Sequence, residues 1–127
     1  MSKPAIIPLM RTGAPDLFRA LADRTRLRLL NLLGDREICV CDLCEVLGES
    51  QPKISRHLAY LRRVGLVAVR QRGKWKHYRI ASELSQLQTR LIDCAASPLG
   101  DSVPVAQDAA RLEKLLRKTS DCRLEEK

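Results

Sequence analysis

The apolar positions in the first third of the chain repeat with the period of an α-helix. The longest repeat covers residues 24–33, which Asp23 can cap and Gly34 can end. The apolar stripe is wide, so we expect this helix to lie at the centre of the core. The stripe consists of Leu27, Leu29, Leu30, Leu32 and Leu33.

A second pair of helical patterns follows, separated by Gly48 and Glu49. The first helix is short and ends near Leu47, and Ser50 can cap the longer second helix, whose first turn tolerates a proline. On the longer helix Arg56 points nearly opposite to the apolar face, which is expected to be buried. This arrangement predicts a helix-turn-helix. The apolar face consists of Ile54, Leu58 and Leu61.

Alternating apolar and polar residues replace the helical pattern after Gly65. Residues 66–70 and 75–80 alternate as strands, and Arg72-Gly73 between them is a hairpin turn signal. A basic hairpin that follows a recognition helix is typical of the wing of a winged helix. The fold class is therefore predicted to be mainly α with a small β-hairpin, a winged helix-turn-helix.

Three weaker helical patterns complete the chain. A helix over residues 15–22 is expected to carry Phe18 and Leu21 on one side, and Ser82 is expected to cap a helix after the wing. The last helix, over residues 105–116, shows an apolar stripe of Ala109, Leu112 and Leu116. The stripe after the wing consists of Leu84, Leu87 and Leu91. The chain then divides into a flexible arm (1–14), a winged-helix domain (15–96), a linker (97–104) and a C-terminal helix with its tail (105–127).

The distribution of charge along the chain indicates a binding partner. The net charge is +8, and residues 50–80 contain basic side chains and no Asp or Glu. Such a one-signed stretch favours a polyanion, and double-stranded DNA fits a helix-turn-helix. A solvated basic face is the plainer interpretation. The basic residues are Lys53, Arg56, Arg62, Arg63, Arg70, Arg72, Lys74, Lys76 and Arg79.

The recognition helix and the wing tip supply the predicted DNA contacts. Gln51 and Arg56 suit base edges, and small hydroxyl or lysine side chains suit phosphates. For His57 a phosphate contact and a packed surface position are equally open. Trp75 and Tyr78 are expected to pack the wing against the body. The predicted DNA-binding residues are Ser50, Gln51, Pro52, Lys53, Ser55, Arg56, His57, Arg72 and Lys74.

Cysteine usage points to metal or thiol chemistry. The apolar run at residues 5–7 is too short for a signal peptide, and no stretch approaches a membrane span, so a cytoplasmic location with reduced thiols is expected. Five cysteines, an odd number, argue against a disulfide framework. Cys94 is expected to be a packing residue, and Cys122 lies in a tail that is expected to be frayed.

Three of the cysteines, Cys39, Cys41 and Cys44, lie within six residues directly before the recognition helix. Cys41 and Cys44 share one helical face, whereas Cys39 lies about 200° round from Cys41 on a regular helix. Cys39 must therefore sit at or before the helix start, or the first turn must unwind when all three bind one ion. Three thiolates without a nearby His suit pyramidal As(III) or Sb(III) better than tetrahedral zinc.

Other interpretations of this segment are weaker. Cysteine is often a small buried apolar residue. A redox switch through a disulfide is possible, although Glu37, Asp42 and Glu45 would raise the thiol pKa values. An enzyme is not expected, because the segment is acidic and no glycine-rich phosphate loop occurs. No constitutive cofactor is expected either.

The motifs together resemble the arsenical-resistance operon repressors of the ArsR/SmtB family. The resemblance spans about residues 15–95 and rests on segments 21–27, 38–44, 50–58 and 72–78. It implies a winged-helix homodimer that represses its own operon and leaves DNA when arsenite or antimonite binds. The family's arsenic ligands carry over onto Cys39, Cys41 and Cys44, and its reading helix onto residues 50–63. The terminal helices form the interface in such dimers, here through Leu84, Leu87 and Leu91.

Departures from related sensors narrow the effector. Zinc sensors place His on the helix after the wing, and residues 82–96 contain none. Cadmium and lead sensors share a pair like Cys39 and Cys41 but add cysteines from the N-terminal arm, and residues 1–14 contain none. Some relatives bind arsenic near the C-terminus, which keeps Cys94 and Cys122 as alternatives. The runner-up function is a repressor that responds to thiol oxidation or to cadmium or lead.

Overall fold

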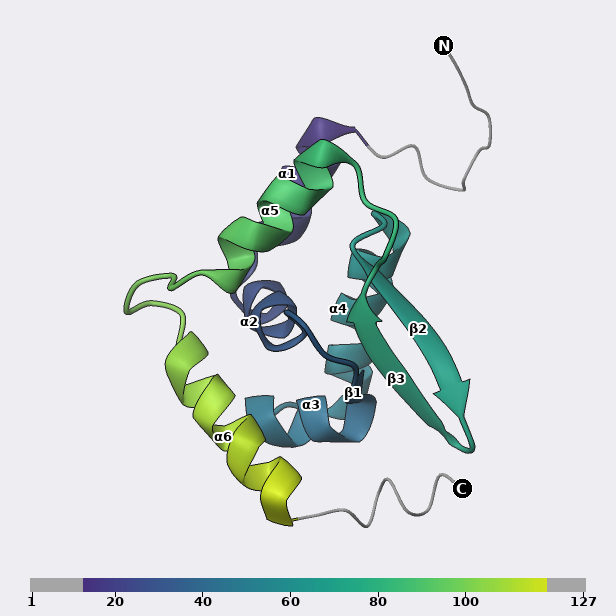
Figure 1. The fold of residues 1–127 in the computed structure, drawn as a ribbon, viewed down its shortest axis with the longest axis vertical. Coiled ribbons are helices and arrows are strands. Elements are labelled where there is room, and N and C mark those ends of the chain that lie inside the picture. Colours follow the sequence, from purple (N-terminus) through teal and green to yellow (C-terminus); the bar gives the residue numbers. More distant parts are fainter. Residues whose placement is uncertain (1–12, 119–127) are drawn as a thin grey trace.

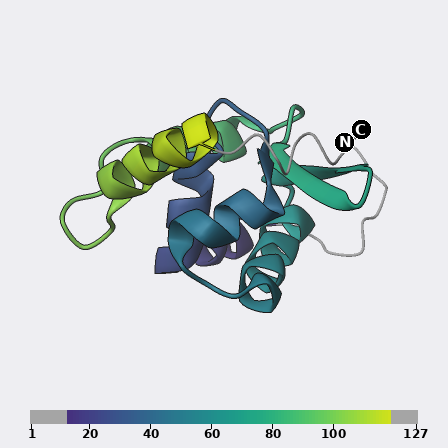
Figure 2. The ribbon, with the colours of Figure 1, turned by 90° about the horizontal axis from the view of Figure 1, so that it is seen from below.

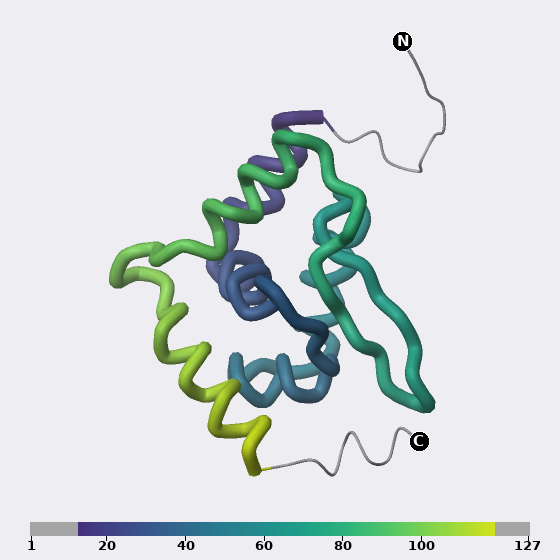
Figure 3. Tube along the Cα trace, in the orientation of Figure 1, coloured from purple at the N-terminus to yellow at the C-terminus, as the bar shows by residue number. Residues whose placement is uncertain are grey.

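The computed structural model describes residues 13–118, so most of the expected arm and tail, Cys122 included, lies outside the described residues. Figure 1 shows the hairpin of β2 and β3 at one side of the helices, and Figure 3 follows the chain through them. No helix among the described residues is long and apolar enough to cross a membrane. The elements are α1 (Ala14–Leu21), α2 (Arg24–Leu32), β1 (Ile38–Cys39), α3 (Val40–Leu47), α4 (Gln51–Arg63), β2 (Val67–Arg72), β3 (Trp75–Ile80), α5 (Gln86–Ala96) and α6 (Val105–Lys118).

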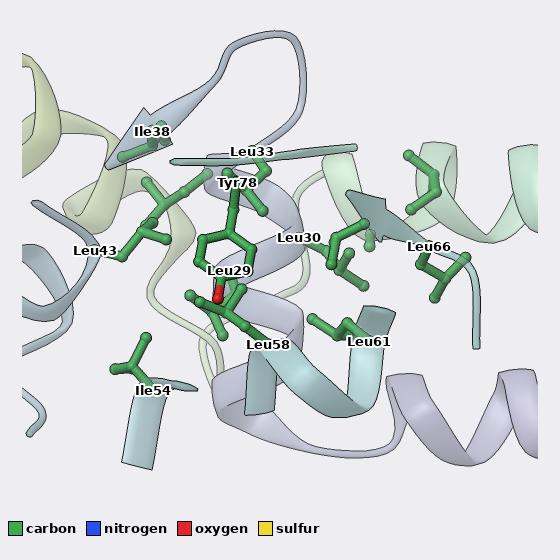
Figure 4. Packing of buried hydrophobic residues seen from close by; sticks show 14 of the residues in the cluster. Leu29, Leu30, Leu33, Ile38, Leu43, Ile54, Leu58, Leu61, Leu66 and Tyr78 are labelled. Atoms are coloured by element: carbon green, nitrogen blue, oxygen red, sulfur yellow. The ribbon is translucent and has the colours of Figure 1, made fainter. Parts of the chain in front are cut away.

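The centre of the fold is α2, as the leucine pattern predicts. Asp23 caps the helix by accepting a hydrogen bond from the Arg26 N–H at 3.0 Å. The helix contacts α1, α4, α5 and α6, and its leucines at positions 29 and 30 are fully buried. Figure 4 shows Tyr78 projecting from β3 into this cluster between Leu29 and Leu58. The expectation that Tyr78 packs the wing against the body is therefore confirmed.

The predicted helix-turn-helix consists of α3 and α4. Gly48 ends α3 in the left-handed conformation (φ 68°), which a residue without a side chain adopts readily. Ser50 caps α4, and its Oγ accepts a hydrogen bond from the Lys53 N–H at 3.4 Å. The predicted buried face is confirmed. It consists of Ile54, Leu58 and Leu61.

The wing forms as predicted, with one additional strand. β2 and β3 pair antiparallel from Val67 opposite Ile80 to Arg72 opposite Trp75, and Gly73 turns the chain with φ 60°. The short strand β1 adds to the free edge of β3 and gives the sheet order β1-β3-β2. Two residues are too few to show strand periodicity, so the sequence gives no signal for β1. Its pairing places Cys39 directly opposite His77.

The helix after the wing starts later than the sequence analysis predicts. Ser82 lies in a bend, and Ser85 is the N-cap. The reason is a capping box: Ser85 Oγ accepts from the Gln88 N–H at 3.1 Å, while the Ser85 N–H donates to Gln88 Oε1 at 2.8 Å. The residue three positions after Ser82 is a serine, which is too short to return the second bond. Leu84 therefore precedes α5.

The buried faces of α1 and α6 also differ from the predicted ones. On α1 the buried residues are Leu17 and Ala20, and Phe18 is 55% exposed. On α6 Ala109 is exposed, and the buried positions are Asp108 and Leu112. On α1 the buried face therefore lies one residue before the predicted one. On α6 Leu112 is buried as predicted and Leu116 is partly buried, so only Ala109 is wrong. The α6 case has an electrostatic cause.

A buried ion pair attaches α6 to the rest of the fold. Asp108 accepts two hydrogen bonds from Arg28 of α2, each at 2.9 Å, and both side chains are buried. A carboxylate in this position has to face its guanidinium, so it sets the rotation of α6. Arg111 extends the attachment by donating to the Val46 carbonyl of α3 at 3.1 Å. Figure 2 shows α3 between α4 and α6.

Removing one partner of this pair should destabilise the protein strongly. Asp108→Ala leaves the Arg28 charge buried without its carboxylate, and we expect the free energy of unfolding to fall by about 3–5 kcal/mol. Urea unfolding measures the change. The control is Glu113→Ala, which removes the exposed ion pair with Arg36 at 2.9 Å and should cost less than about 1 kcal/mol. Equal costs for the two variants would contradict the assignment.

Candidate nucleic-acid interface and thiol site

The outward face of α4 carries the side chains that the sequence analysis assigns to DNA. Gln51, Pro52 and Arg56 are exposed, whereas Lys53 and Ser55 are partly buried. Lys53 Nζ lies 3.2 Å from Glu49 Oε1, so its charge is partly compensated. The structure therefore presents Gln51 and Arg56 most openly. Ser50, at the N-cap of this face, is exposed too.

The wing tip adds a second basic surface beside α4. Arg72 and Lys74 are exposed on either side of the turn. The Lys74 ammonium lies 5.9 Å from the centre of the Trp75 ring, within range of a cation–π contact. Trp75 Nε1 is buried and has no hydrogen-bond acceptor among residues 13–118. Packing rather than hydrogen bonding therefore holds this indole.

His57 occupies the packed position that the sequence analysis left open. Its Nδ1 lies 3.3 Å from Arg26 Nη1 and 3.7 Å from Asp23 Oδ2. Burial lowers the pKa of His57 below its usual range, against the opposing effect of Asp23. The imidazole is thus largely neutral at pH 7, which weakens the case for a phosphate contact. The sequence analysis missed Arg26, which also stacks 4.2 Å over the Tyr60 ring and so joins α2 to α4.

The three clustered cysteines lie at the junction of β1 and α3. Cys39 is the N-cap residue of α3 with extended backbone (φ −67°, ψ 142°), so the prediction that it sits before the helix is confirmed. Its Sγ lies 3.0 Å from the Sγ of Cys41 in the first turn. Cys44 follows one turn later and is partly buried. Within residues 13–118 no three Cys, His, Asp or Glu side chains are gathered closely enough to hold a metal ion. The thiols therefore form a close pair with a third thiol nearby.

The electrostatic environment keeps the third thiol protonated. Burial raises the pKa of Cys44, and a charge on Cys39 raises it further. The Cys41 thiol points toward Asp42, with Sγ 4.0 Å from Oδ1. A ligand that binds Cys44 must accordingly displace its thiol proton.

An open hollow of about 520 Å³ connects the thiols to both DNA-facing elements. Cys41 and Cys44 line it from α3, Gln51 lines it from the start of α4, and Trp75 lines it from the wing. The sequence analysis did not place Trp75 beside the cysteines. Only the pairing of β1 with β3 brings the wing strand to the cysteine segment. That pairing was invisible in the sequence.

An ion pair fixes the other side of the same junction. Arg70 of β2 donates two hydrogen bonds to Glu37, each at 2.8 Å. The Arg70 guanidinium lowers the pKa of Glu37, so the carboxylate is charged at neutral pH. Glu37 immediately precedes β1. The cysteine segment is thus attached to both strands of the wing.

Residues 23–69 match the family described as bacterial regulatory protein, arsR family. The arsenical resistance operon repressor of Escherichia coli (strain K12) is 53% identical over 78 residues, which cover 61% of this chain and 67% of the relative. The chain belongs to the ArsR family. Its fold agrees: HlyU from Vibrio cholerae N16961 superposes with a TM-score of 0.57 at 36% identity, covering 64% of this chain and 85% of that one. The AntR antimony-specific transcriptional repressor gives 0.52 at 32% identity, covering 61% and 68%.

Membership of the ArsR family makes the chain a DNA-binding transcriptional repressor with a winged helix-turn-helix. Regulators of this family, rather than enzymes, are its sequence and structural relatives. The matched segment contains the cysteine cluster and α4 and ends within β2. Trp75 and α6 lie outside the matched segment, so the family match says nothing about their roles.

The remaining described cysteine does not behave as the sequence analysis expects. Cys94 is exposed on α5, so its interpretation as a packing residue is wrong. The helical stripe inside α5 is formed by Leu91, Ile92 and Ala95, and Cys94 falls outside it. Leu87 of α5 and the preceding Leu84 are only partly buried. An apolar surface therefore remains where α5 lies beside α1 (Figure 1).

Proposed function

We propose that this chain is an arsenite- or antimonite-responsive repressor of an arsenic-resistance operon. It binds operator DNA as a homodimer and dissociates when Cys39, Cys41 and Cys44 bind As(III) or Sb(III). The observation that carries the proposal is the pair of Sγ atoms 3.0 Å apart at the start of α3, beside the recognition helix. The printed names of the relatives, an arsenical resistance repressor and an antimony-specific repressor, support the choice of effector.

Operator recognition is assigned to α4 in the major groove, with the wing tip on the DNA backbone. Gln51 and Arg56, two exposed side chains of α4, are proposed to read base edges. The remaining residues position the helix on the phosphates, with His57 acting mainly through its contact with Arg26. They are Ser50, Pro52, Lys53, Ser55, His57, Arg72 and Lys74.

The homodimer is proposed to form through α1 and α5. Phe18 on α1 is 55% exposed, and a large apolar side chain in that position favours burial against a partner. Leu84 and Leu87 are partly buried and Leu91 is buried, and α5 packs against α1. A twofold pair would present two recognition helices to half-sites about one DNA turn apart.

The donor set fits the proposed effector. Binding of arsenite replaces its three hydroxyls by three thiolates, and the three thiol protons leave with the hydroxyls as water. Cys41 and Cys44 belong to α3, whereas Cys39 lies in extended backbone before it. Cys39 and Cys41 are already close, so bringing the Cys44 thiol to the same arsenic atom has to shift the first turn of α3. Since α3 packs on α4 and β1 pairs with β3, the shift reaches both DNA-facing elements.

A thiol-redox switch is the second candidate, and the same close pair favours it. Oxidation of Cys39 and Cys41 to a disulfide would consume two thiols and also rearrange the start of α3. Peroxide would then release the protein from DNA and arsenite would not. Cadmium and lead are alternative effectors as well, because two thiols alone bind soft divalent ions.

The ligand set can be tested by substituting the three thiols one at a time. Substitution of Cys39, Cys41 or Cys44 by Ser removes one sulfur ligand, and we expect the arsenite concentration that releases half of the protein from DNA to rise at least about tenfold. Fluorescence anisotropy with labelled promoter DNA from upstream of the chain's own gene measures this release. DNA affinity without arsenite should remain within about twofold, because a serine hydroxyl is close to a thiol in size.

The matched control is Cys94→Ser, which changes an exposed cysteine on α5 and should leave the response unchanged. Normal release of the triple Ser variant by arsenite would refute the site. Release of the wild type by peroxide but not by arsenite would establish the redox alternative.

Substitution of Arg56 separates DNA binding from effector binding. Arg56→Ala should weaken operator binding by about 5- to 150-fold, the range for loss of one base-reading Arg. Its arsenite affinity, measured by calorimetry without DNA, should stay within about twofold of the wild type. Arg117→Ala on α6 is the control, since it removes the same exposed charge from a helix that packs on α2 and α3 rather than on α4. Equal losses of operator affinity in the two variants would mean that Arg56 acts only through the net charge of the protein.

A further inference from the structure

We propose that the hollow beside Cys41 is a subsite for the carbon substituent of trivalent organoarsenicals, and that the Trp75 ring is its contact surface. This inference rests on the proposed function and adds a ligand class to it. The ligands are monosubstituted arsenicals that carry one aryl or alkyl group on arsenic. The subsite does not require the third thiol.

The spacing of the thiols favours such a ligand. A monosubstituted arsenical in water has one As–C bond and two exchangeable hydroxyls. Two thiols replace these hydroxyls: two As–O bonds break, two As–S bonds form, and the thiol protons leave with the hydroxyls as two waters. Arsenic stays trivalent throughout, so no oxidant or reductant is needed. Cys39 and Cys41, with their sulfurs 3.0 Å apart, are the pair that is already close.

The hollow gives the substituent a place to lie. Cys41 belongs both to the close thiol pair and to the lining of the hollow, so a group carried by arsenic at this pair lies at the hollow's edge. Trp75 also lines the hollow, and its indole is only partly exposed and has no hydrogen bond through Nε1 among the described residues. An aromatic ring prefers an apolar or aromatic neighbour in offset or edge-to-face contact. A phenyl group satisfies that preference, and a third hydroxyl does not.

Charge in the hollow selects against other occupants. Glu45 and Glu49 line it together with the thiols, whereas its other lining residues are uncharged. An anionic ligand would be repelled by Glu45, and less by Glu49, whose charge Lys53 partly compensates. A monosubstituted trivalent arsenical is neutral at pH 7 and is tolerated. The lining therefore fits a thiol-reactive, uncharged, partly apolar molecule.

The subsite also touches the DNA-reading element. Gln51 lines the same hollow and is the first residue of α4. A substituent held against Trp75 thus lies beside a proposed base-reading side chain, in addition to any shift of α3. We expect an organoarsenical to release DNA while engaging only two thiols. Cys44→Ser should consequently impair the response to arsenite more than the response to a phenyl-substituted arsenical.

The test compares phenylarsine oxide, which hydrates to the dihydroxy form, with arsenite. Titration calorimetry uses the full chain carrying Cys94→Ser and Cys122→Ser, so that only the clustered thiols report. Trp75→Leu should weaken phenylarsine oxide binding by about two- to tenfold, the range for loss of an aromatic pair. Arsenite affinity should stay within about twofold, and Trp75→Phe should retain most of the phenylarsine oxide affinity.

Trp75 is the single tryptophan of the chain, so the unsubstituted indole supplies a second readout. Phenylarsine oxide should change its emission at a one-to-one ratio, and this measurement needs no change at position 75. Equal weakening of both ligands in Trp75→Leu, or no weakening of either, would overturn the subsite. Binding of phenylarsine oxide without any change in emission would overturn it as well. Failure of the parent protein to bind either arsenical would instead refute the proposed function.

Discussion

The pairing of β1 with β3 is the constraint on which the functional parts of this molecule depend. Two residues of backbone hold Cys39 opposite His77 and thereby attach the cysteine segment to the wing. The same pairing fixes the extended backbone that immediately precedes α3. Glu37 and Arg70 reinforce it from the outer strand. A change at the thiols is therefore felt in the wing and in the helix-turn-helix together.

The opposite end of α3 is held by different interactions. Arg111 of α6 donates to the Val46 carbonyl, and the buried pair of Arg28 and Asp108 fixes α6 to the central helix. Cys39 and Cys41, by contrast, lie just before α3 and in its first turn, and Cys44 follows one turn later. Helices lack intrahelical partners for their first N–H groups, so the first turn is the part most easily rearranged. The structure thus confines deformation to the end of α3 that carries the cysteines.

Much of the fold follows from local sequence signals. Asp23, Gly48 and Ser50 have short-range chemistry that specifies helix ends, and the recognition helix shows its buried face by its period. The placement of Cys39 outside α3 followed from angles on a helical wheel. Local rules succeed in these cases because the deciding contacts lie within four residues.

The parts that escaped prediction depend on contacts between distant segments. Asp108, and not Ala109, lies on the inner face of α6 because it pairs with Arg28. These two residues are 80 positions apart in the chain, so no local pattern indicates the pair. Trp75 lies at the cysteine site because β3 pairs with β1, and β1 has only two residues and shows no recognisable pattern. Periodicity and composition carry no information about such pairs. The start of α5 is the exception, because the capping box that joins Ser85 to Gln88 is local and the sequence analysis overlooked it in favour of Ser82.

The central claim is that the effector acts by deforming the helix that supplies its ligands. Amide hydrogen exchange, followed by mass spectrometry with and without arsenite, measures this directly. The account predicts faster exchange in residues 43–47 of α3 when arsenite is bound, with unchanged protection in the central helix α2. Unchanged or stronger protection of α3, in a protein that arsenite nonetheless releases from DNA, would contradict it.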